Sequence, residues 1–237
     1  MRPGYLLTLP LTDYPSALAL QHDCVSARRS GSLQRDLIIF LEHPPVFTLG
    51  RRGGRDNLLI PESTLKARNI AVIPAERGGD ITYHGPGQLV AYLIIDLKQA
   101  GLSVTELVDR LETIMIRTVA HWQVTAEGNR KHRGVWTQNG KLGSIGLTIR
   151  RGISFHGLAL NVNTDLAPFR WINPCGIEGC AMTSLAQETG GPVPMEAVRK
   201  QMADQLDTQL GLTLAATTIG TIQSSLIHAA NPIGGMD

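Results

Sequence analysis

The sequence is poor in cysteine, and its opposite charges nearly cancel. Three cysteines, an odd number in a chain of 237 residues, favour a reducing compartment over a disulfide framework. A formal net charge of +2, from 22 basic and 20 acidic residues, is too small to favour a nucleic acid as a partner. We therefore expect a cytoplasmic protein that does not bind nucleic acid.

Long hydrophobic runs are also missing. No stretch approaches the roughly 18 uninterrupted apolar residues of a membrane span, so we expect no membrane partner. Pro3, Pro10 and Asp13 interrupt the apolar residues near the start, which argues against a signal peptide. Apolar residues make up 43% of the chain, enough to bury a substantial core. We expect one domain over residues 1–237, with the tail after about residue 220 loosely held.

Neither common phosphate-binding loop is present. The spacings G-x-x-x-x-G-K-[ST] and G-x-G-x-x-G do not occur, and the glycine-rich segment RGGDITYHGPGQLVAYLIID (77–96) leads into an apolar strand rather than a helix. Its glycines let the backbone approach a ligand closely, and its cation, hydroxyls, imidazole and amide can bind one. We interpret the segment as the wall of a pocket, and a surface β-turn is the alternative.

Periodicity and turn signals predict an α+β fold, a mixed and mostly antiparallel sheet with helices packed on it. A capping box, Ser103 with Glu106, begins the clearest helix. An Asn139-Gly140 turn and a second turn at Arg150–Gly152 predict a three-stranded meander over 134–162. The other predicted elements are helices over 14–29, 61–68, 104–121 and 195–210 and a buried strand over 37–42.

Cys175 stands out among the cysteines because Pro174 and Gly176 flank it. Such a cysteine lies on a turn, where its sulfur can be exposed in a cleft. Cys180 also neighbours a glycine and is the competing candidate, while Cys24 lies on a predicted helix and is expected to be structural. A buried, unreactive thiol is the alternative for each of them.

Lys141 is the second unusual position, because it starts a strand that contains Gly143 and Gly146. Glycines weaken a strand, so their presence implies that something approaches this strand closely. The next strand repeats the pattern with His156-Gly157. Together these glycines would form a smooth groove suited to a slender apolar substrate, although a solvated lysine beside a turn is the simpler interpretation of Lys141.

Four segments, in this order, carry a family resemblance: RGGDITYHGPGQLVAY, GVW…GKLGSIG, SFHGLALN and NPCGI. They resemble the lipoyl(octanoyl) transferases, which share a fold superfamily with the lipoate and biotin protein ligases, and the resemblance covers residues 37–185. It implies transfer of an octanoyl group from acyl carrier protein to a lysine of a lipoyl domain through a cysteine thioester. Implied acceptors are the lipoyl domains of 2-oxoacid dehydrogenases and the glycine cleavage H protein, and no cofactor or metal is implied.

The resemblance also assigns roles to residues. The thioester cysteine falls on Cys175 and the family's lysine on Lys141. The implied substrate-binding residues are Arg77, Gly78, Gly79, Asp80, Ile81, Thr82, Tyr83, His84, Ser144, Ile145, Gly146, Gly157, Leu158 and Ala159.

The implied chemistry is reasonable on its own terms. Exchange of one thioester for another is nearly thermoneutral and amide formation is downhill, so no ATP is needed. Lys141 could act as an ammonium that stabilises the Cys175 thiolate, or as a neutral base. Backbone N–H groups near Gly176 or in the glycine-rich segment could stabilise the oxyanion. His84 or His156 as a general base is a weaker alternative.

Three other functions remain open. An ATP-dependent lipoate or biotin ligase would activate a free acid and would not need a nucleophilic cysteine. A non-catalytic acyl-binding protein would bury Cys175 unused. A metal site of Cys175, Cys180 and a histidine lacks the second ligand pair that zinc sites usually have.

Two basic clusters could bind an acidic carrier protein. The first contains Arg51, Arg52 and Arg55, and the second contains Arg130, Lys131 and Arg133. A solvated loop is the alternative for each cluster.

Overall fold

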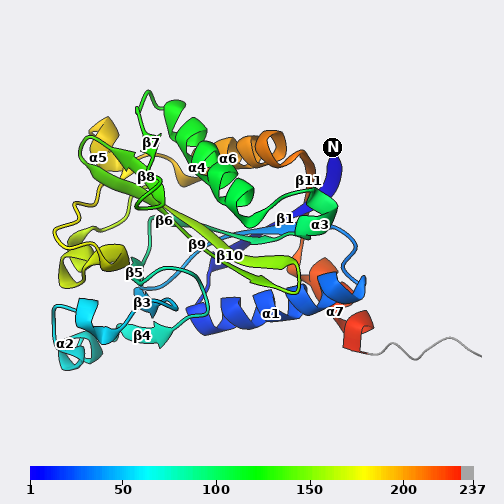
Figure 1. The fold of residues 1–237 in the computed structure, drawn as a ribbon, viewed down its shortest axis with the longest axis horizontal. Helices are drawn as coiled ribbons and strands as arrows, with labels where there is room; N and C mark the ends of the chain where they lie inside the picture. The colour runs from blue at the N-terminus through cyan, green and yellow to red at the C-terminus, as the bar shows by residue number, and fades with distance from the viewer. Residues whose placement is uncertain (231–237) are drawn as a thin grey trace, which may run out of the picture.

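The computed structural model describes residues 1–230, and the side chains of residues 1–226. An eight-stranded sheet crosses the molecule, with strand order β11-β1-β2-β6-β10-β9-β8-β7 (Figure 1). β1 runs parallel to β2 and β11, and the other neighbours in this sheet are antiparallel. The predicted α+β fold with a mixed, mostly antiparallel sheet is confirmed, and so is the meander of β8, β9 and β10.

The element bounds are as follows. The strands are β1 (Arg2–Leu11), β2 (Asp36–Glu42), β3 (Val46–Leu49), β4 (Ala71–Pro74), β5 (Ile81–His84), β6 (Gln88–Ile94), β7 (Glu127–Gly128), β8 (Gly134–Thr137), β9 (Gly140–Arg150), β10 (Ile153–Asn161) and β11 (Leu212–Thr217). The α-helices are α1 (Tyr14–Ser30), α2 (Glu62–Lys66), α3 (Leu97–Ala100), α4 (Val104–Ala120), α5 (Leu185–Thr189), α6 (Met195–Leu210) and α7 (Ile219–Ala230). Short 3₁₀ helices are η1 (Arg55–Asn57), η2 (Ala167–Trp171) and η3 (Pro174–Gly176).

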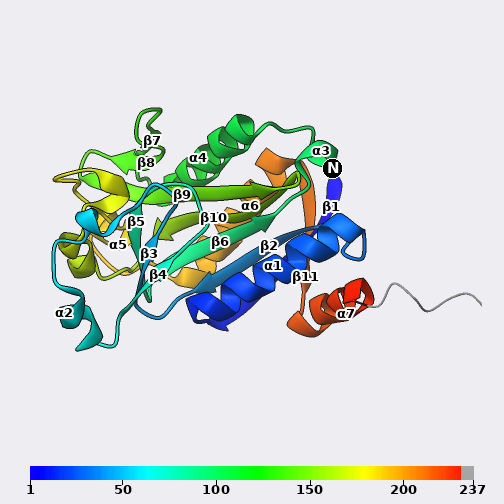
Figure 2. The same cartoon turned by 60° about the horizontal axis from the view of Figure 1, so that its bottom comes forward.

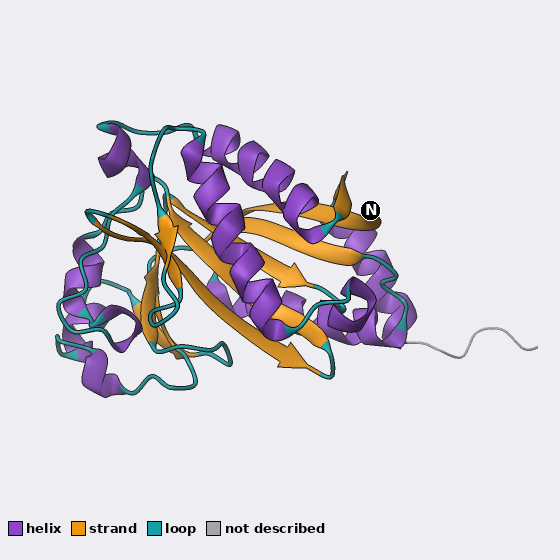
Figure 3. Ribbon diagram, turned by 45° about the horizontal axis from the view of Figure 1, so that its top comes forward, coloured by secondary structure: helices purple, strands orange, loops and turns teal. Residues whose placement is uncertain are grey.

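Helices cover both faces of the large sheet. α4 and α6 lie side by side across one face (Figure 3), while α1 and α7 lie on the other (Figure 1, Figure 2). Successive residues of β6 point to opposite faces, so Ala91 joins the core beneath α4 and Tyr92 joins the core beneath α1. Every residue of β6 is therefore buried, which explains its nearly continuous apolar sequence.

A three-stranded sheet, in the order β4-β3-β5, lies beside the large sheet. Residues 81–84, expected to belong to a glycine-rich loop, are strand β5, paired antiparallel with β3. Their β-branched and aromatic side chains favour a strand. Ile81 and Tyr83 pack with Phe47 in a separate apolar cluster, so Thr82 and His84 face the opposite way.

The predicted helices agree closely with the observed ones, and the capping box of Ser103 and Glu106 is present. The hairpin differs by one residue, because Thr137 pairs with Gly140 and the loop is residues 138–139. Gly140 has φ 141°, and a Cβ there would lie 2.5 Å from the Ala181 carbonyl oxygen. Both this backbone conformation and the neighbouring loop therefore require a glycine.

The expectation of a loosely held tail does not describe residues 219–230. They form α7, whose Ile222 is fully buried in the core beneath α1. The remainder of that tail, 231–237, lies outside the described residues.

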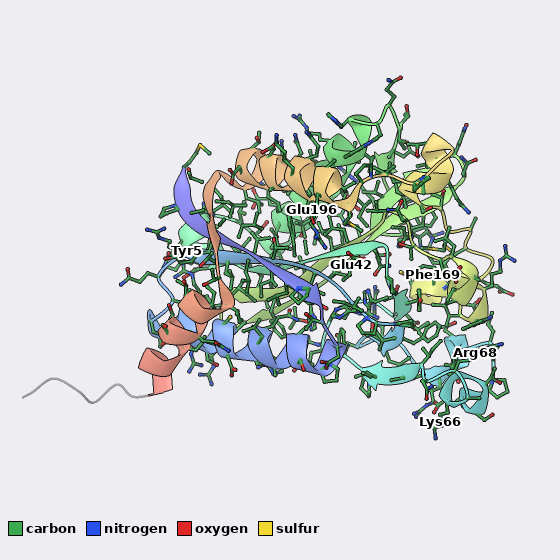
Figure 4. All side chains as sticks on the ribbon, turned by 180° about the vertical axis from the view of Figure 1, so that it is seen from behind. Tyr5, Glu42, Lys66, Arg68, Phe169 and Glu196 are labelled. Atoms are coloured by element: carbon green, nitrogen blue, oxygen red, sulfur yellow. The ribbon has the colours of Figure 1, made fainter. Side chains whose placement is uncertain are left out.

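Glu42 joins three parts of the fold at the end of β2, in the position labelled in Figure 4. Its Oε2 accepts a hydrogen bond from the Gly87 N–H at 2.7 Å, and its Oε1 pairs with Arg199 of α6 at 3.0 Å. The turn between β5 and β6 is therefore tied to both β2 and α6.

A buried histidine connects the chain before α1 to the large sheet. The Thr12 carbonyl oxygen lies 2.6 Å from His43 Nδ1, so Nδ1 carries the proton and Nε2 accepts from the Tyr92 hydroxyl at 2.7 Å. Burial lowers the pKa of His43 to about 4. The folded protein therefore holds this ring neutral.

The depressed pKa of His43 predicts a loss of stability in mild acid. The unfolded histidine binds a proton below about pH 6.5 while the folded one does not until about pH 4, so stability falls across that interval. Replacing His43 by Gln should reduce the stability lost between pH 7 and pH 5 by about 2 kcal/mol, measured by urea unfolding. The exposed His121→Gln variant should behave as wild type, and an equal loss in all three proteins would contradict the prediction.

Candidate active site

Lys141 and Cys175 meet although 34 residues separate them in sequence. The Lys141 amine lies 3.4 Å from Cys175 Sγ and donates to the Arg133 carbonyl oxygen at 3.0 Å. It also lies 5.1 Å from the ring centre of Trp136. The side chain is only 1% exposed, so the solvated alternative for this lysine is wrong.

Backbone pairing fixes this meeting. The Lys141 N–H donates to the Ala181 carbonyl oxygen at 2.8 Å, and the Thr183 N–H donates to the Lys141 carbonyl oxygen at 3.0 Å. The loop that follows Cys175 is thus bonded alongside the first residues of β9. A Cβ on Gly134 would lie 2.8 Å from Lys141 Cε, so a glycine on β8 makes room for the lysine side chain.

Cys175 has a left-handed backbone, with φ 59° and ψ 21°. This conformation costs a non-glycine residue about 1–3 kcal/mol and persists only where surrounding contacts hold it. The Gly176 N–H donates to the Asn173 carbonyl oxygen at 2.9 Å, and the Asn173 N–H donates to the Asn57 carbonyl oxygen at 2.9 Å. Asn57 Nδ2 in turn donates to Asp80 at 2.8 Å. These bonds hold the cysteine turn against η1 and the segment before β5.

The other two thiols are less suited to reaction. Burial raises the pKa of Cys24 to about 12, and this residue is fully buried on the inner face of α1. Burial also raises the pKa of the Cys180 thiol, against the opposing effect of Lys141. A raised pKa leaves less thiolate, which is the reactive form.

A cavity extends from Cys175 between the two sheets, and most of its lining is apolar. The lining residues are Tyr14, Arg77, Gly78, Gly79, Thr82, His84, Val90, Tyr92, Ser144, Ile145, Gly146, His156, Gly157, Leu158, Ala159 and Cys175.

Arg77 is a buried cation in this lining, 8% exposed. Its guanidinium donates to the Thr48 carbonyl oxygen at 2.6 Å, to Thr48 Oγ1 at 2.8 Å and to the Gly78 carbonyl oxygen at 3.1 Å. Among the described residues it forms no ion pair. Burial lowers its pKa, against the opposing effects of Tyr14 and Cys175, but a guanidinium stays charged.

Most of the substrate-binding residues implied by the resemblance lie together around this cavity. Three do not. Ile81 and Tyr83 face the apolar cluster on the other side of β5, because strand residues alternate. Asp80 accepts from Asn57 and lies under Gly176, where a Cβ would approach its Oδ2 to 2.8 Å. Its position suits holding the cysteine turn rather than contacting a substrate.

Four lining residues were absent from the implied set. Val90 and Tyr92 lie two residues apart on β6 and therefore share one face of the sheet, so strand periodicity could have identified them. His156 is, in the sequence analysis, only a weaker candidate for a general base. Tyr14, at the start of α1, carried no sequence signal, because it is brought to the site by packing alone.

The two histidines in the cavity are neutral. Burial lowers the pKa of His84 well below its usual value, and lowers that of His156 to about 3. His84 Nδ1 is 2.7 Å from Gln88 Oε1, so it donates to the amide oxygen. The structure shows no hydrogen bond from either ring to Cys175, whose sulfur instead contacts Lys141.

A wider groove opens on the outer side of Cys175. Lys141 and Cys175 both line this groove. Its remaining lining comes from the start of α4, the 130–133 loop, the glycine-rich segment, β9 and two single residues after β3 and η3: Arg52, Gly78, Gly79, Val104, Thr105, Val108, Asp109, Arg130, Lys131, His132, Arg133, Ile145, Gly146, Leu147 and Ile177.

Neither a metal cluster nor a membrane helix is found in the described part of the chain. No group of three or more His, Cys, Asp or Glu side chains there could hold a metal ion. No helix within residues 1–230 has the length and apolar character needed to span a bilayer.

Comparisons with known proteins show the family. A family model described as the lipoyl protein ligase A/B catalytic domain matches residues 13–207. The chain belongs to this family. Among its relatives, an octanoyltransferase from Desulfotalea psychrophila is 49% identical over 201 residues, 84% of this chain and 90% of that protein. Another, from Azotobacter vinelandii, is 45% identical over 217 residues, 91% of this chain and 95% of that protein. The resemblance indicated by the four segments is confirmed.

Solved structures show the same fold at low identity. A lipoate-protein ligase A bound with ATP superposes with a TM-score of 0.75 at 17% identity, covering 97% of this chain and 95% of that chain. A bi-partite lipoate protein ligase from Thermoplasma acidophilum has a TM-score of 0.75 at 16% identity, covering 98% and 93%. The α+β fold is therefore that of the lipoate ligases.

The geometry predicts different reactivities for the three thiols. Iodoacetamide should modify Cys175 faster than Cys180 and should leave Cys24 untouched in the folded protein, measured by peptide mass spectrometry. Lys141→Ala should slow modification of Cys175 about tenfold, because the amine stabilises the thiolate. Lys131→Ala removes a lysine from the same groove without a contact to the sulfur and should have little effect. Equal rates at Cys175 and Cys180 would contradict this assignment.

Proposed function

We propose that this chain transfers an octanoyl group from acyl carrier protein to a lysine of a lipoyl domain, through a thioester on Cys175. The acceptors would be the lipoyl domains of 2-oxoacid dehydrogenases and the glycine cleavage H protein, and residues 1–237 would act as one acyltransferase domain. The observation that carries the proposal is the 3.4 Å contact of the Lys141 amine with Cys175 Sγ at the mouth of an apolar cavity.

The transfer takes two steps. Lys141 gives up a proton in the first step and takes one back in the second. The Cys175 thiolate attacks the carrier thioester, and the departing carrier thiolate takes a proton from the Lys141 ammonium. The acyl group is then on Cys175 and the lysine is neutral. The acceptor amine attacks this second thioester and gives its extra proton to Lys141, while the Cys175 thiolate leaves. The starting pair is restored, and no ATP is consumed.

The glycine-rich segment is the better source of an oxyanion donor. The Gly176 N–H is already bonded to the Asn173 carbonyl oxygen, and the Gly78 N–H is bonded to a β9 carbonyl oxygen at 3.0 Å. The Gly79 N–H has no partner within residues 1–230, and Gly79 lines both the cavity and the groove with Cys175. We assign this N–H to the developing oxyanion, with the Arg77 cation adding to the favourable potential.

An ATP-dependent ligase is the alternative of the same fold. That reaction activates a carboxylate as an adenylate and needs no thiol nucleophile. The lysine amine beside the strained Cys175 favours the transferase, as do relatives named octanoyltransferase. Formation of product from a carrier thioester without ATP separates the two.

Mass spectrometry tests the intermediate directly. Wild-type protein mixed with octanoyl carrier protein and no ATP should gain one octanoyl group, lost again when a lipoyl domain is added. Cys175→Ser should form no adduct, since an alcohol ionises far less readily than a thiol. Cys180→Ala is the matched control and should acylate normally. An active Cys175→Ser variant, or an inactive Cys180→Ala variant, would show that Cys175 is not the cysteine that carries the acyl group.

The groove outside Cys175 is the proposed carrier surface. It brings Arg52 of the first basic cluster beside Arg130 and Lys131 of the second. These three side chains form no ion pair within the described residues. Arg55, by contrast, pairs with Glu62, and Arg133 pairs with acidic residues of α4. The unpaired cations line the same groove as Cys175 and match the charge of an acidic carrier.

Charge reversal should therefore weaken carrier binding. Arg130→Glu combined with Lys131→Glu should raise the KM for octanoyl carrier protein roughly tenfold at low salt, and should flatten its dependence on ionic strength. The control, Lys66→Glu with Lys200→Glu, makes the same charge change on exposed residues outside the groove. Equal salt sensitivity in wild type and both variants would mean that this groove does not guide the carrier.

A further inference from the structure

The acyl cavity contains polar atoms that have no partner. His156 is 1% exposed, and neither of its ring nitrogens has a hydrogen bond within the described chain. Tyr14 is 2% exposed, and its hydroxyl likewise has none. Both residues line the same cavity as Cys175. Buried polar atoms nearly always have a hydrogen-bond partner, so three buried polar atoms without one in a single cavity indicate that a ligand binds there.

The backbone at His156 is distorted so that the ring lies in this cavity. His156 has φ 57° inside β10, and its N–H donates to Gln21 Oε1 of α1 at 2.7 Å. Gly157 follows, where a Cβ would lie 2.1 Å from the Ala91 carbonyl oxygen. Backbone strain of this kind is found mainly at functional sites, so the position of the His156 ring points to a role in the cavity.

The unpartnered atoms belong to residues that line the cavity and not the groove. Cys175, Gly78, Gly79, Ile145 and Gly146 line both the cavity and the open groove, and therefore mark the mouth. His156 and Tyr14 line the cavity alone.

The cavity lining is apolar at Val90 and Leu158 and polar at His156 and Tyr14, and we call the latter part the inner end. Along β10 the lining extends from Ala159 to His156, about 10 Å at the usual rise of a strand.

The inner end matches the needs of a water molecule. The neutral imidazole of His156 offers one N–H donor and one acceptor, and Tyr14 offers a hydroxyl that can do either. Burial holds both groups uncharged, lowering the pKa of His156 to about 3 and raising that of Tyr14 to about 12. A buried water usually makes two to four hydrogen bonds, which these atoms can supply.

We propose that His156 and Tyr14 hold ordered water at the inner end of the cavity, and that this water limits the length of the acyl chain loaded onto Cys175. An octanoyl chain would end before the water. A longer chain would displace it and would leave three buried polar atoms facing methylene groups, which opposes binding. The proposal rests on the octanoyl transfer proposed above and identifies the residues that set its chain length.

Competition between two donors tests the proposal. Octanoyl and dodecanoyl carrier proteins are mixed in equal amounts with each enzyme variant, and intact mass gives the ratio of the two acyl-enzymes after a short reaction. Tyr14→Phe removes only the hydroxyl oxygen, and His156→Leu replaces the ring with an apolar side chain. Each should raise the dodecanoyl-to-octanoyl ratio about tenfold, equivalent to about 1.4 kcal/mol. Tyr5→Phe, a change on β1 at the position labelled in Figure 4, should keep the wild-type ratio.

The outcomes separate this inference from the function on which it rests. If wild type forms no acyl-enzyme with either donor, the proposed function fails. If wild type is loaded with octanoyl and both variants keep its ratio, the inference is overturned. Reduced octanoyl loading with no gain for dodecanoyl would also overturn it, since the two side chains would then support the cavity without limiting its length. Should His156→Leu fail to fold, Tyr14→Phe alone decides.

Discussion

The site depends on the bonding of one loop along one strand. Lys141 exchanges backbone hydrogen bonds with Ala181 and Thr183, and this pairing brings the chain that carries Cys175 beside β9. The amine then needs only its own side-chain length to reach the sulfur at 3.4 Å. Because the partners of both residues are backbone atoms of a sheet and of a short loop, the pair is positioned before any substrate binds.

The second constraint is the absence of side chains at one level of the sheet. Gly146 and Gly157 are paired directly across β9 and β10. A Cβ on Gly157 would collide with the Ala91 carbonyl oxygen, and one on Gly146 would lie 3.0 Å from Arg77 Cδ. Gly146 therefore allows the buried Arg77 to pack closely against β9, and Gly157 allows β10 to approach β6 closely. The same strands that form the core thus provide a slender cavity, without any large loop.

Cys175 borders two different surroundings. Its sulfur lies where a mostly apolar cavity meets a groove that carries unpaired cations. In the proposed mechanism the apolar side would exclude water from a thioester, which slows its hydrolysis. The groove would admit the carrier and then the acceptor in turn. Because Cys175 would hold the acyl group between these two steps, the proposed partners need not bind together.

The sequence alone determined the fold class, the family and the bounds of four helices. Helical periodicity, the Ser103 capping box and the glycine turns predicted these helices and the meander, because such signals are local. Four segments also identified the family and singled out Cys175 and Lys141. Tertiary structure decided what local signals do not encode. Strand alternation turned Ile81 and Tyr83 away from the cavity, packing of α1 added Tyr14, and long-range bonds made Asp80 a support for the cysteine turn. Such outcomes depend on which distant segments meet, and a residue's neighbours in sequence carry little information about that.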